Sequence, residues 1–483
     1  MSCLNYFKKE ILDNIYRFTP FLIYFIYTLF LLFLNKNYIN NDGIGYLVIA
    51  NLIDAGNIEK AIELNVDLFF PNLIFLFSKY FFIDLFLAAK LITLIFFLIF
   101  FFFFSSIIKL LLKDKLANLI SLISLICFYQ LFDKYLPMII REPGFWAAGI
   151  GGIFFYLKSF LERKPFLLVY STIFFVFASL FRTEGLFFAL SSLLALTIAL
   201  LENIFKQHNC KITFKKIINF IFIFFVIIIL LSYFYFSNKI YFHRVNEIIE
   251  RISVIFNPLD LFSNDKWLVE LIKDNPLLLK ISFYSSLFTY KLFNLIGVIN
   301  ILIISLSFKS RLLDRNLKVL LLSAFFVTLV PPLLNLFSTN VISSRYLILS
   351  SFVLFIFHSI GIHYLFFQIQ KKLIHLLFSL FILVNILFIC FDKPKFNEEK
   401  YIADWFISNN IKIESIFIDN MKIRFFFDNY DYVNPLSPDD LLNNKYSFFV
   451  FDSEDKYDLY SMGLVKVESD SLNRIKKYVI YRR

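Results

Sequence analysis

Long apolar stretches, separated by short polar segments, dominate the pattern along the chain. A bilayer core about 30 Å thick requires roughly 20 apolar residues per spanning helix, and runs approaching this length recur from residue 18 to residue 391. They are too long and too uniformly apolar for barrel strands, and helices satisfy their own backbone hydrogen bonds in lipid. The pattern predicts eleven transmembrane helices, at 18–34, 83–108, 116–132, 144–161, 166–181, 185–201, 217–236, 284–306, 319–336, 346–366 and 373–391.

Composition agrees with this prediction. Of the 483 residues, 59% are hydrophobic, only 18% are charged, and 69 are phenylalanine. A soluble core does not require so much apolar side chain. The chain is therefore expected to be a polytopic α-helical membrane protein. Residues 1–17 lack the apolar core and cleavage site of a signal peptide, so we expect them to remain in the mature chain.

The distribution of basic residues predicts the orientation. The net charge is +11, and lysines and arginines gather in alternate loops, within 8–17, 109–115, 158–164, 206–216, 309–318 and 371–372. Cytoplasmic loops are enriched in these residues. The amino terminus is therefore predicted in the cytoplasm of a bacterial inner membrane, and the carboxy terminus on the periplasmic or extracellular side. Because the charge follows topology, we expect membrane lipids as partners and no nucleic acid.

The pattern changes after residue 391. An amphipathic helix is predicted in "EEKYIADWFISNN", followed by short strands in "IESIFID", "IRFFFDN", "YSFFVFDS", "GLVKVES" and "KKYVIYR". The predicted organisation is a membrane domain over 1–391, with outside loops at 35–82 and 237–283, and a small soluble periplasmic α/β domain over 392–483.

Several charged residues fall at the predicted outer face. Charged groups near helix ends snorkel, pair with each other or serve a site. Each has a structural explanation: a helix cap for Asp42, a helix start for Arg141 and Glu142, a mutual pair for Arg182 and Glu184, and an interfacial anchor for Arg345 and Tyr346. Their grouping on one face favours a site, because a guanidinium matches phosphate bidentately and stays charged.

Five segments together resemble the GT-C superfamily, whose members are membrane glycosyltransferases that use polyprenyl-phosphate sugars. The bacterial branch of aminoarabinose transferases and protein O-mannosyltransferases is the most similar part. The segments are "NDGIGYLVIANLIDAGN", "FFPNLIFLFSKYFFIDLFLAAKLITLI", "REPGFWAAGIGGIFFYL", "ASLFRTEGLFFAL" and "SSRYLILSSFVLF". A carboxy-terminal domain outside the membrane also fits that branch.

The resemblance implies a GT-C-like fold and an inverting sugar transfer. Asp42 would be the catalytic residue, and Arg182 and Arg345 would bind the donor phosphate. Supporting residues would be Tyr46, Glu184, Arg141, Glu142 and Tyr346. The acceptor would be a cell-envelope glycan, a lipid or a protein.

Many relatives carry a second acid beside this aspartate, whereas here Asn41 and Gly43 flank Asp42. We therefore expect no cofactor to be required; a divalent metal is compatible with the chain but has no support in the sequence. The four cysteines lack metal-ligand spacing.

Two other functions remain open from the sequence. An O-antigen or polysaccharide polymerase would have a similar span count, but the early position of Asp42 and the carboxy-terminal domain argue against it. A non-enzymatic flippase or transporter of lipid-linked glycans usually carries polar groups or broken helices near the bilayer midplane. Most predicted spans here have apolar interiors, with Lys90 as an exception.

Overall fold

The computed structural model is predominantly helical. It describes residues 2–64, 68–128, 134–206, 276–339, 344–369, 372–390 and 398–411, together with the short pieces 416–418, 423, 426–427, 447–452, 465–467 and 478–482. The predicted span 217–236 and most of the predicted outside loop 237–283 lie outside these residues. The chain separates into two compact units, the first comprising 1–27, 95–132 and 141–391, and the second 28–94, 133–140 and 392–483.

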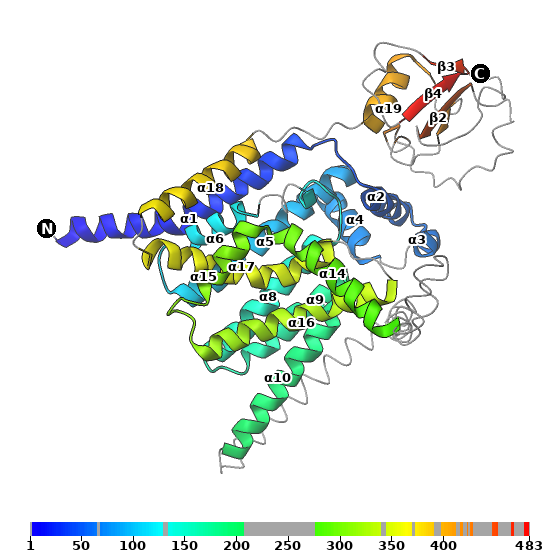
Figure 1. The fold of residues 1–483 in the computed structure, drawn as a ribbon. Coiled ribbons are helices and arrows are strands. Elements are labelled where there is room, and N and C mark those ends of the chain that lie inside the picture. Colours follow the sequence, from blue (N-terminus) through cyan, green and yellow to red (C-terminus); the bar gives the residue numbers. More distant parts are fainter. Residues whose placement is uncertain are drawn as a thin grey trace. The chain divides into compact units, whose positions relative to one another are not determined.

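Helix positions follow the apolar pattern closely (Figure 1). The helices that coincide with predicted spans are α1 (Ser2–Leu34), α5 (Leu85–Leu112), α6 (Ala117–Ile126), α8 (Glu142–Leu161), α9 (Leu167–Phe181), α10 (Glu184–Lys206), α16 (Arg315–Thr339), α17 (Ser344–Phe367) and α18 (Lys372–Cys390). Within the described residues, four helices are long and apolar enough to cross a membrane, and one bent pair makes up to five. This supports a helical membrane protein, while the full count of eleven spans stays a prediction.

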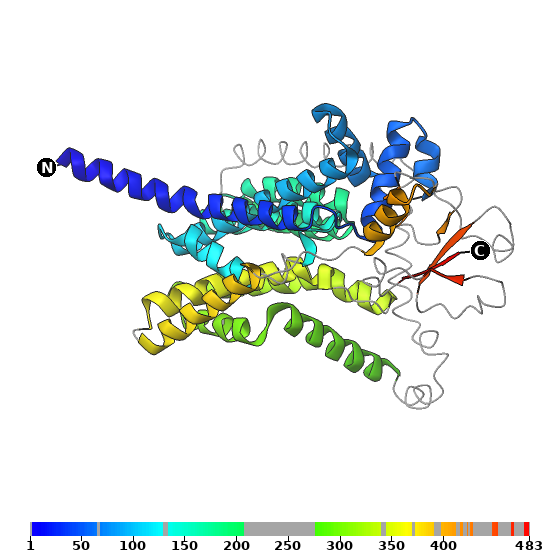
Figure 2. The ribbon, with the colours of Figure 1, turned by 90° about the horizontal axis from the view of Figure 1, so that it is seen from above.

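The predicted continuous span at 284–306 is broken in the structure. Helix α14 (Pro276–Ile296) ends before Gly297, and α15 (Val298–Ser307) starts at an angle of 88° to it (Figure 2). Gly297 has a φ of +81°, a backbone conformation that favours glycine. The apolar pattern does not reveal the break, because both arms of the bend are apolar.

In the first unit, glycines allow neighbouring helices to approach closely. A side chain at Gly152 in α8 would clash with Phe175 of α9, and Ser171 of α9 donates a hydrogen bond to the Gly152 carbonyl. In α17, a Cβ at Gly361 would lie 2.1 Å from the main-chain oxygen of Ile303 in α15. Small residues at such crossings are characteristic of helix packing in membranes.

The second unit contains the short helices α2 (Asn41–Asp54), α3 (Ile58–Leu64) and α4 (Phe69–Phe81). Helix α4 lies within the predicted outside loop 35–82 and is separate from the span that follows it. It ends at Phe81, and the next residue, Phe82, has a φ of +53°. Asp84 then accepts a hydrogen bond from the Leu87 amide, which caps the start of α5.

The described carboxy-terminal residues, also part of the second unit, form a small sheet and a helix. Strands β1 (Ile416–Ile418), β2 (Phe448–Asp452), β4 (Tyr478–Arg482) and β3 (Val465–Lys466) pair in that order. The β1–β2 pair is parallel and the other two pairs are antiparallel. Helix α19 (Glu398–Ser408) shares a hydrophobic core with the sheet. Ile423, Phe426 and Phe427, within the predicted strand "IRFFFDN", lie outside any strand.

The close approach of α15 and α17 yields a prediction about stability. We expect Gly361→Ala to lower the free energy of unfolding by about 1–3 kcal/mol, because the added methyl group meets rigid main chain. The matched variant Gly149→Ala should cost less, because its Cβ meets the flexible end of Leu349. Thermal unfolding in detergent tests both, and equal losses would contradict this account.

Candidate functional site

The chain reverses direction sharply between α9 and α10. Arg182 follows α9 in an extended conformation, and Glu184 already starts α10. A Cβ at Gly185 would lie 2.4 Å from the Ser179 nitrogen and 2.7 Å from the Phe175 oxygen. Only glycine therefore fits the return, which explains the residue that follows Glu184 in the sequence.

Arg182 is the centre of a buried ionic cluster in the first unit. Its Nε donates to Glu184 Oε2 at 3.2 Å and its Nη2 donates to Glu184 Oε1 at 2.6 Å, so the contact is bidentate. Its Nη1 donates to Glu142 Oε1 at 2.9 Å. The pairing of Arg182 with Glu184 that the sequence allows is thus present, and Glu142 joins it from a helix start 40 positions away.

Arg345 enters the cluster through the same carboxylate oxygen. Its Nε lies 3.4 Å from Glu142 Oε1, and the ring of Tyr346 lies next to both arginines, 4.3 Å from the Arg182 guanidinium and 5.4 Å from that of Arg345. Cation–π contacts of this kind favour the charged form. Arg141, at the start of α8, also interacts favourably with Glu184.

Burial strengthens these ion pairs and makes each charged group dependent on its partners. The side chains of Arg182 and Glu142 are 9% and 4% exposed, whereas that of Arg345 is 28% exposed. Burial alone would lower the pKa of Arg182, but the carboxylates of Glu184 and Glu142 outweigh it and raise this pKa. Glu142 Oε2 is buried without a hydrogen-bond partner among the described residues.

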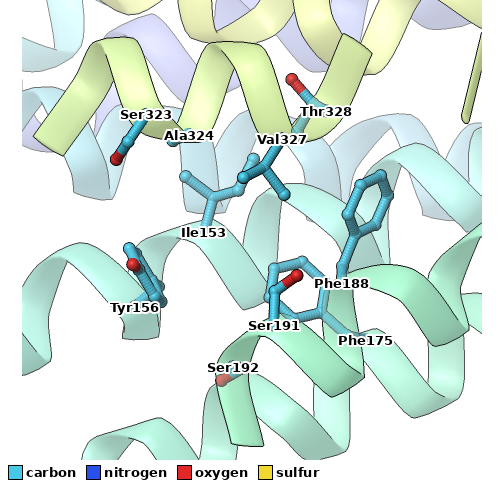
Figure 3. Close-up of a pocket in the computed structure, with 10 residues that line it drawn as sticks. All are labelled: Ile153, Tyr156, Phe175, Phe188, Ser191, Ser192, Ser323, Ala324, Val327 and Thr328. Carbon is cyan, nitrogen blue, oxygen red and sulfur yellow. The ribbon is translucent and has the colours of Figure 1, made fainter. Parts of the chain in front are cut away.

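The cluster borders a small pocket. Arg182, Glu184, Arg345 and Tyr346 line this pocket with Phe145, Phe188, Thr328, Pro331, Pro332 and Leu349. Phe188 and Thr328 also line a second, largely apolar cavity between α8, α9, α10 and α16, with Tyr156 and Ser323 farther along it. Figure 3 shows the side chains of α16 facing those of the other three helices across this second cavity.

Asp42 lies in the second unit, in the first turn of α2. The sequence interpretation of Asp42 as the helix cap is wrong by two positions, because the N-cap is Asn40. Asn40 Oδ1 does not cap its own helix but accepts a hydrogen bond from the Ile139 amide at 2.8 Å. The Asp42 side chain is exposed, and negative charge is favoured at a helix amino terminus.

The same contact explains why no acid directly follows Asp42. A Cβ at Gly43 would lie 2.9 Å from Asn40 Oδ1 and 2.9 Å from Ile139 Cβ. A second carboxylate immediately after Asp42 would have no room. Tyr46, one turn on from Gly43, is 8% exposed and packs edge-on against Phe70 of α4 at 5.2 Å.

The structure therefore assembles part of the predicted site. Arg182, Glu142, Glu184, Arg345 and Tyr346 are in contact with one another through the cluster, with Arg141 beside them, and Asp42 and Tyr46 belong to the other compact unit. Among the described residues, no group of three or more His, Cys, Asp or Glu side chains is arranged to hold a metal ion.

Sequence reasoning missed a buried polar network in the first unit. Ser124 Oγ lies 2.9 Å from His358 Nδ1, and His358 Nε2 lies 3.1 Å from Asn300 Oδ1. The Asn300 amide nitrogen donates to the carbonyls of Cys127 and Ile296. The signal available in the sequence is a histidine in an otherwise apolar predicted span.

In comparisons with known proteins, no protein-family model, no curated protein and no solved structure matches this chain.

The cluster predicts a strict requirement for arginine at position 182. Arg182→Lys should lower the free energy of unfolding by about 3–5 kcal/mol. An ammonium group cannot form a bidentate contact with Glu184 and a hydrogen bond to Glu142 at the same time. As a control, Glu162→Gln removes the solvent-exposed pairs with Lys158 and Lys164 and should leave the melting temperature unchanged. A lysine variant as stable as the wild type would contradict this reading of the cluster.

Proposed function

We propose that the protein is an integral-membrane inverting glycosyltransferase. It moves a sugar from a polyprenyl-phosphate donor to a cell-envelope glycan, lipid or protein acceptor at the outer face of a bacterial inner membrane. The proposal includes eleven spans and a carboxy-terminal α/β domain outside the membrane.

One observation carries this proposal: the arginine cluster lines a pocket that shares Phe188 and Thr328 with a largely apolar cavity between helices. The three arginines exceed the two glutamates by one positive charge, which a lipid phosphate complements. The neighbouring cavity is lined by Phe188, Phe175, Ile153 and Val327, apolar side chains of the kind that an isoprenoid chain packs against. A ligand with an anionic head and an apolar tail matches both parts.

The two predicted phosphate ligands have different roles in this proposal. Arg182 is held by two carboxylates and is nearly inaccessible, so it orients the cluster. Arg345 is the more exposed of the two and contacts the donor phosphate. Its guanidinium stabilises the negative charge that develops as the phosphate leaves, an effect strengthened in a partly dry site.

Asp42 acts as the general base. Its carboxylate takes the proton of the acceptor hydroxyl, whose oxygen forms a bond to the anomeric carbon while the bond from that carbon to the phosphate oxygen breaks. The attack from the opposite side inverts the configuration. Tyr46, in the same helix, packs against Phe70 of α4 and supports the first turns of α2.

The proposal predicts separable effects of two substitutions. Asp42→Asn should lower kcat by about a hundred- to ten-thousand-fold with little change in donor affinity. Arg345→Gln should weaken donor binding and lower kcat by roughly a hundred-fold or more, while Arg311→Gln, in a predicted cytoplasmic loop, should do neither. The measurement is release of polyprenyl phosphate by purified protein supplied with a panel of polyprenyl-phosphate sugars. Full turnover in Asp42→Asn would remove Asp42 from the mechanism.

The orientation is tested separately. A reporter fused after Lys393 is expected to be active on the periplasmic side, because eleven spans begin from a cytoplasmic amino terminus. A fusion after Lys309 serves as the cytoplasmic control. A cytoplasmic reporter at Lys393 would place the proposed site on the wrong face of the membrane.

A flippase or transporter of lipid-linked glycans is the second candidate function. The helix break at Gly297 favours it, because broken helices near the membrane midplane form solute sites in transporters. The ten-residue α15 spans about 15 Å, half of a bilayer core. Asn300 and Asn385 line a cavity beside the break. Translocation of a lipid-linked sugar in proteoliposomes, without release of polyprenyl phosphate, would favour this function over transfer.

A further inference from the structure

Lys90 is a buried lysine that the proposed reaction leaves without a role. It lies in the second turn of α5 and is 5% exposed. A buried charge is expensive unless hydrogen bonds replace its hydration. An apolar residue would fill the same position at lower cost, so the ammonium group requires an explanation.

The ammonium group joins two segments that are distant in the sequence. Lys90 Nζ donates to the Tyr38 carbonyl at 2.9 Å and to the Pro137 carbonyl, and it lies 5.3 Å from the centre of the Phe86 ring. An ammonium has three donors, and charge-assisted hydrogen bonds are roughly twice as strong as neutral ones. One side chain therefore holds two loops near the amino-terminal end of α5.

The two loops also contact each other beside Asp42. Asn40 Oδ1 accepts from the Ile139 amide, and the Asn40 carbonyl accepts the first hydrogen bond of α2, from the Ile44 amide at 3.2 Å. Tyr38 and Pro137 each lie two positions before a partner of this contact. The position of the first turn of α2 is thus determined from α5 through Lys90.

We propose that Lys90 is a positioning residue for Asp42. It acts through the main chain: by holding Tyr38 and Pro137 it sets the register of Asn40 against Ile139, and so the place of the carboxylate two residues later. Because this role rests on the proposed glycosyl transfer, it concerns kcat rather than donor binding. A misplacement of about 1 Å in a catalytic group can cost roughly a hundred-fold in rate.

The test compares Lys90→Met with Thr93→Val in the full-length protein. Thr93 is buried in the same helix, and its hydroxyl bonds only within that helix, to the Ala89 carbonyl. We expect Lys90→Met to lower kcat by roughly ten- to a hundred-fold with donor KM within about two-fold of wild type, and Thr93→Val to leave both unchanged. Hydrogen exchange of the amides in 40–50 should accelerate in the methionine variant alone.

Two further variants keep the test decisive if Lys90→Met does not fold. Asn40→Ala removes the contact with Ile139 and should lower kcat in the same way, whereas Lys90→Arg, which can still donate to both carbonyls, should restore most of the turnover. An unchanged kcat in Lys90→Met, or in Asn40→Ala where Lys90→Met does not fold, would overturn the role of Lys90. A variant that loses only melting temperature would do the same. A wild-type protein that releases no polyprenyl phosphate would instead refute the glycosyltransferase proposal.

Discussion

The ionic cluster around Arg182 determines where the neighbouring helix ends can lie, because a guanidinium group removed from water must find its hydrogen-bond partners inside the protein. Three donor nitrogens of Arg182 contact carboxylates at 2.6–3.2 Å. Those carboxylates come from the starts of two helices, and the tyrosine ring stacked on the guanidinium comes from a third. The ends of α8, α9, α10 and α17 therefore converge on one point. The glycine at 185 and the short return between α9 and α10 follow from that convergence.

The cluster also distinguishes two arginines that the sequence treats alike. The donors of Arg182 are engaged by two carboxylates, so this residue supports the cluster. Arg345 shares one carboxylate at a longer distance and has more freedom to bind a ligand. The charge excess of the cluster faces an interior lined by aromatic and aliphatic side chains. Electrostatic attraction is strong in such surroundings, so an anionic ligand would gain most there.

The sequence predicts the helices well and their interactions poorly. Span boundaries agree to within a few residues for α5, α8 and α17 because apolar length alone determines them. The pair formed by Arg182 and Glu184 can also be predicted from the sequence, since the two residues are close in the chain. The contact of Glu142 with Arg182, the bend at Gly297 and the contact of Asn40 with Ile139 depend on tertiary packing. No local pattern encodes them.

The glycine that follows Asp42 is a consequence of packing. Gly43 lies between Asn40 and Ile139, so a carboxylate at this position would disrupt the contact beside the first turn of α2. A pair of acids would serve a metal ion or share a proton. In the proposed reaction one carboxylate and a separate guanidinium group divide the work, with the proton taken at Asp42 and the phosphate charge stabilised at Arg345. In the proposed reaction the rate depends on how accurately α2 is positioned. This requirement explains the buried Lys90, which holds the segments next to the start of α2.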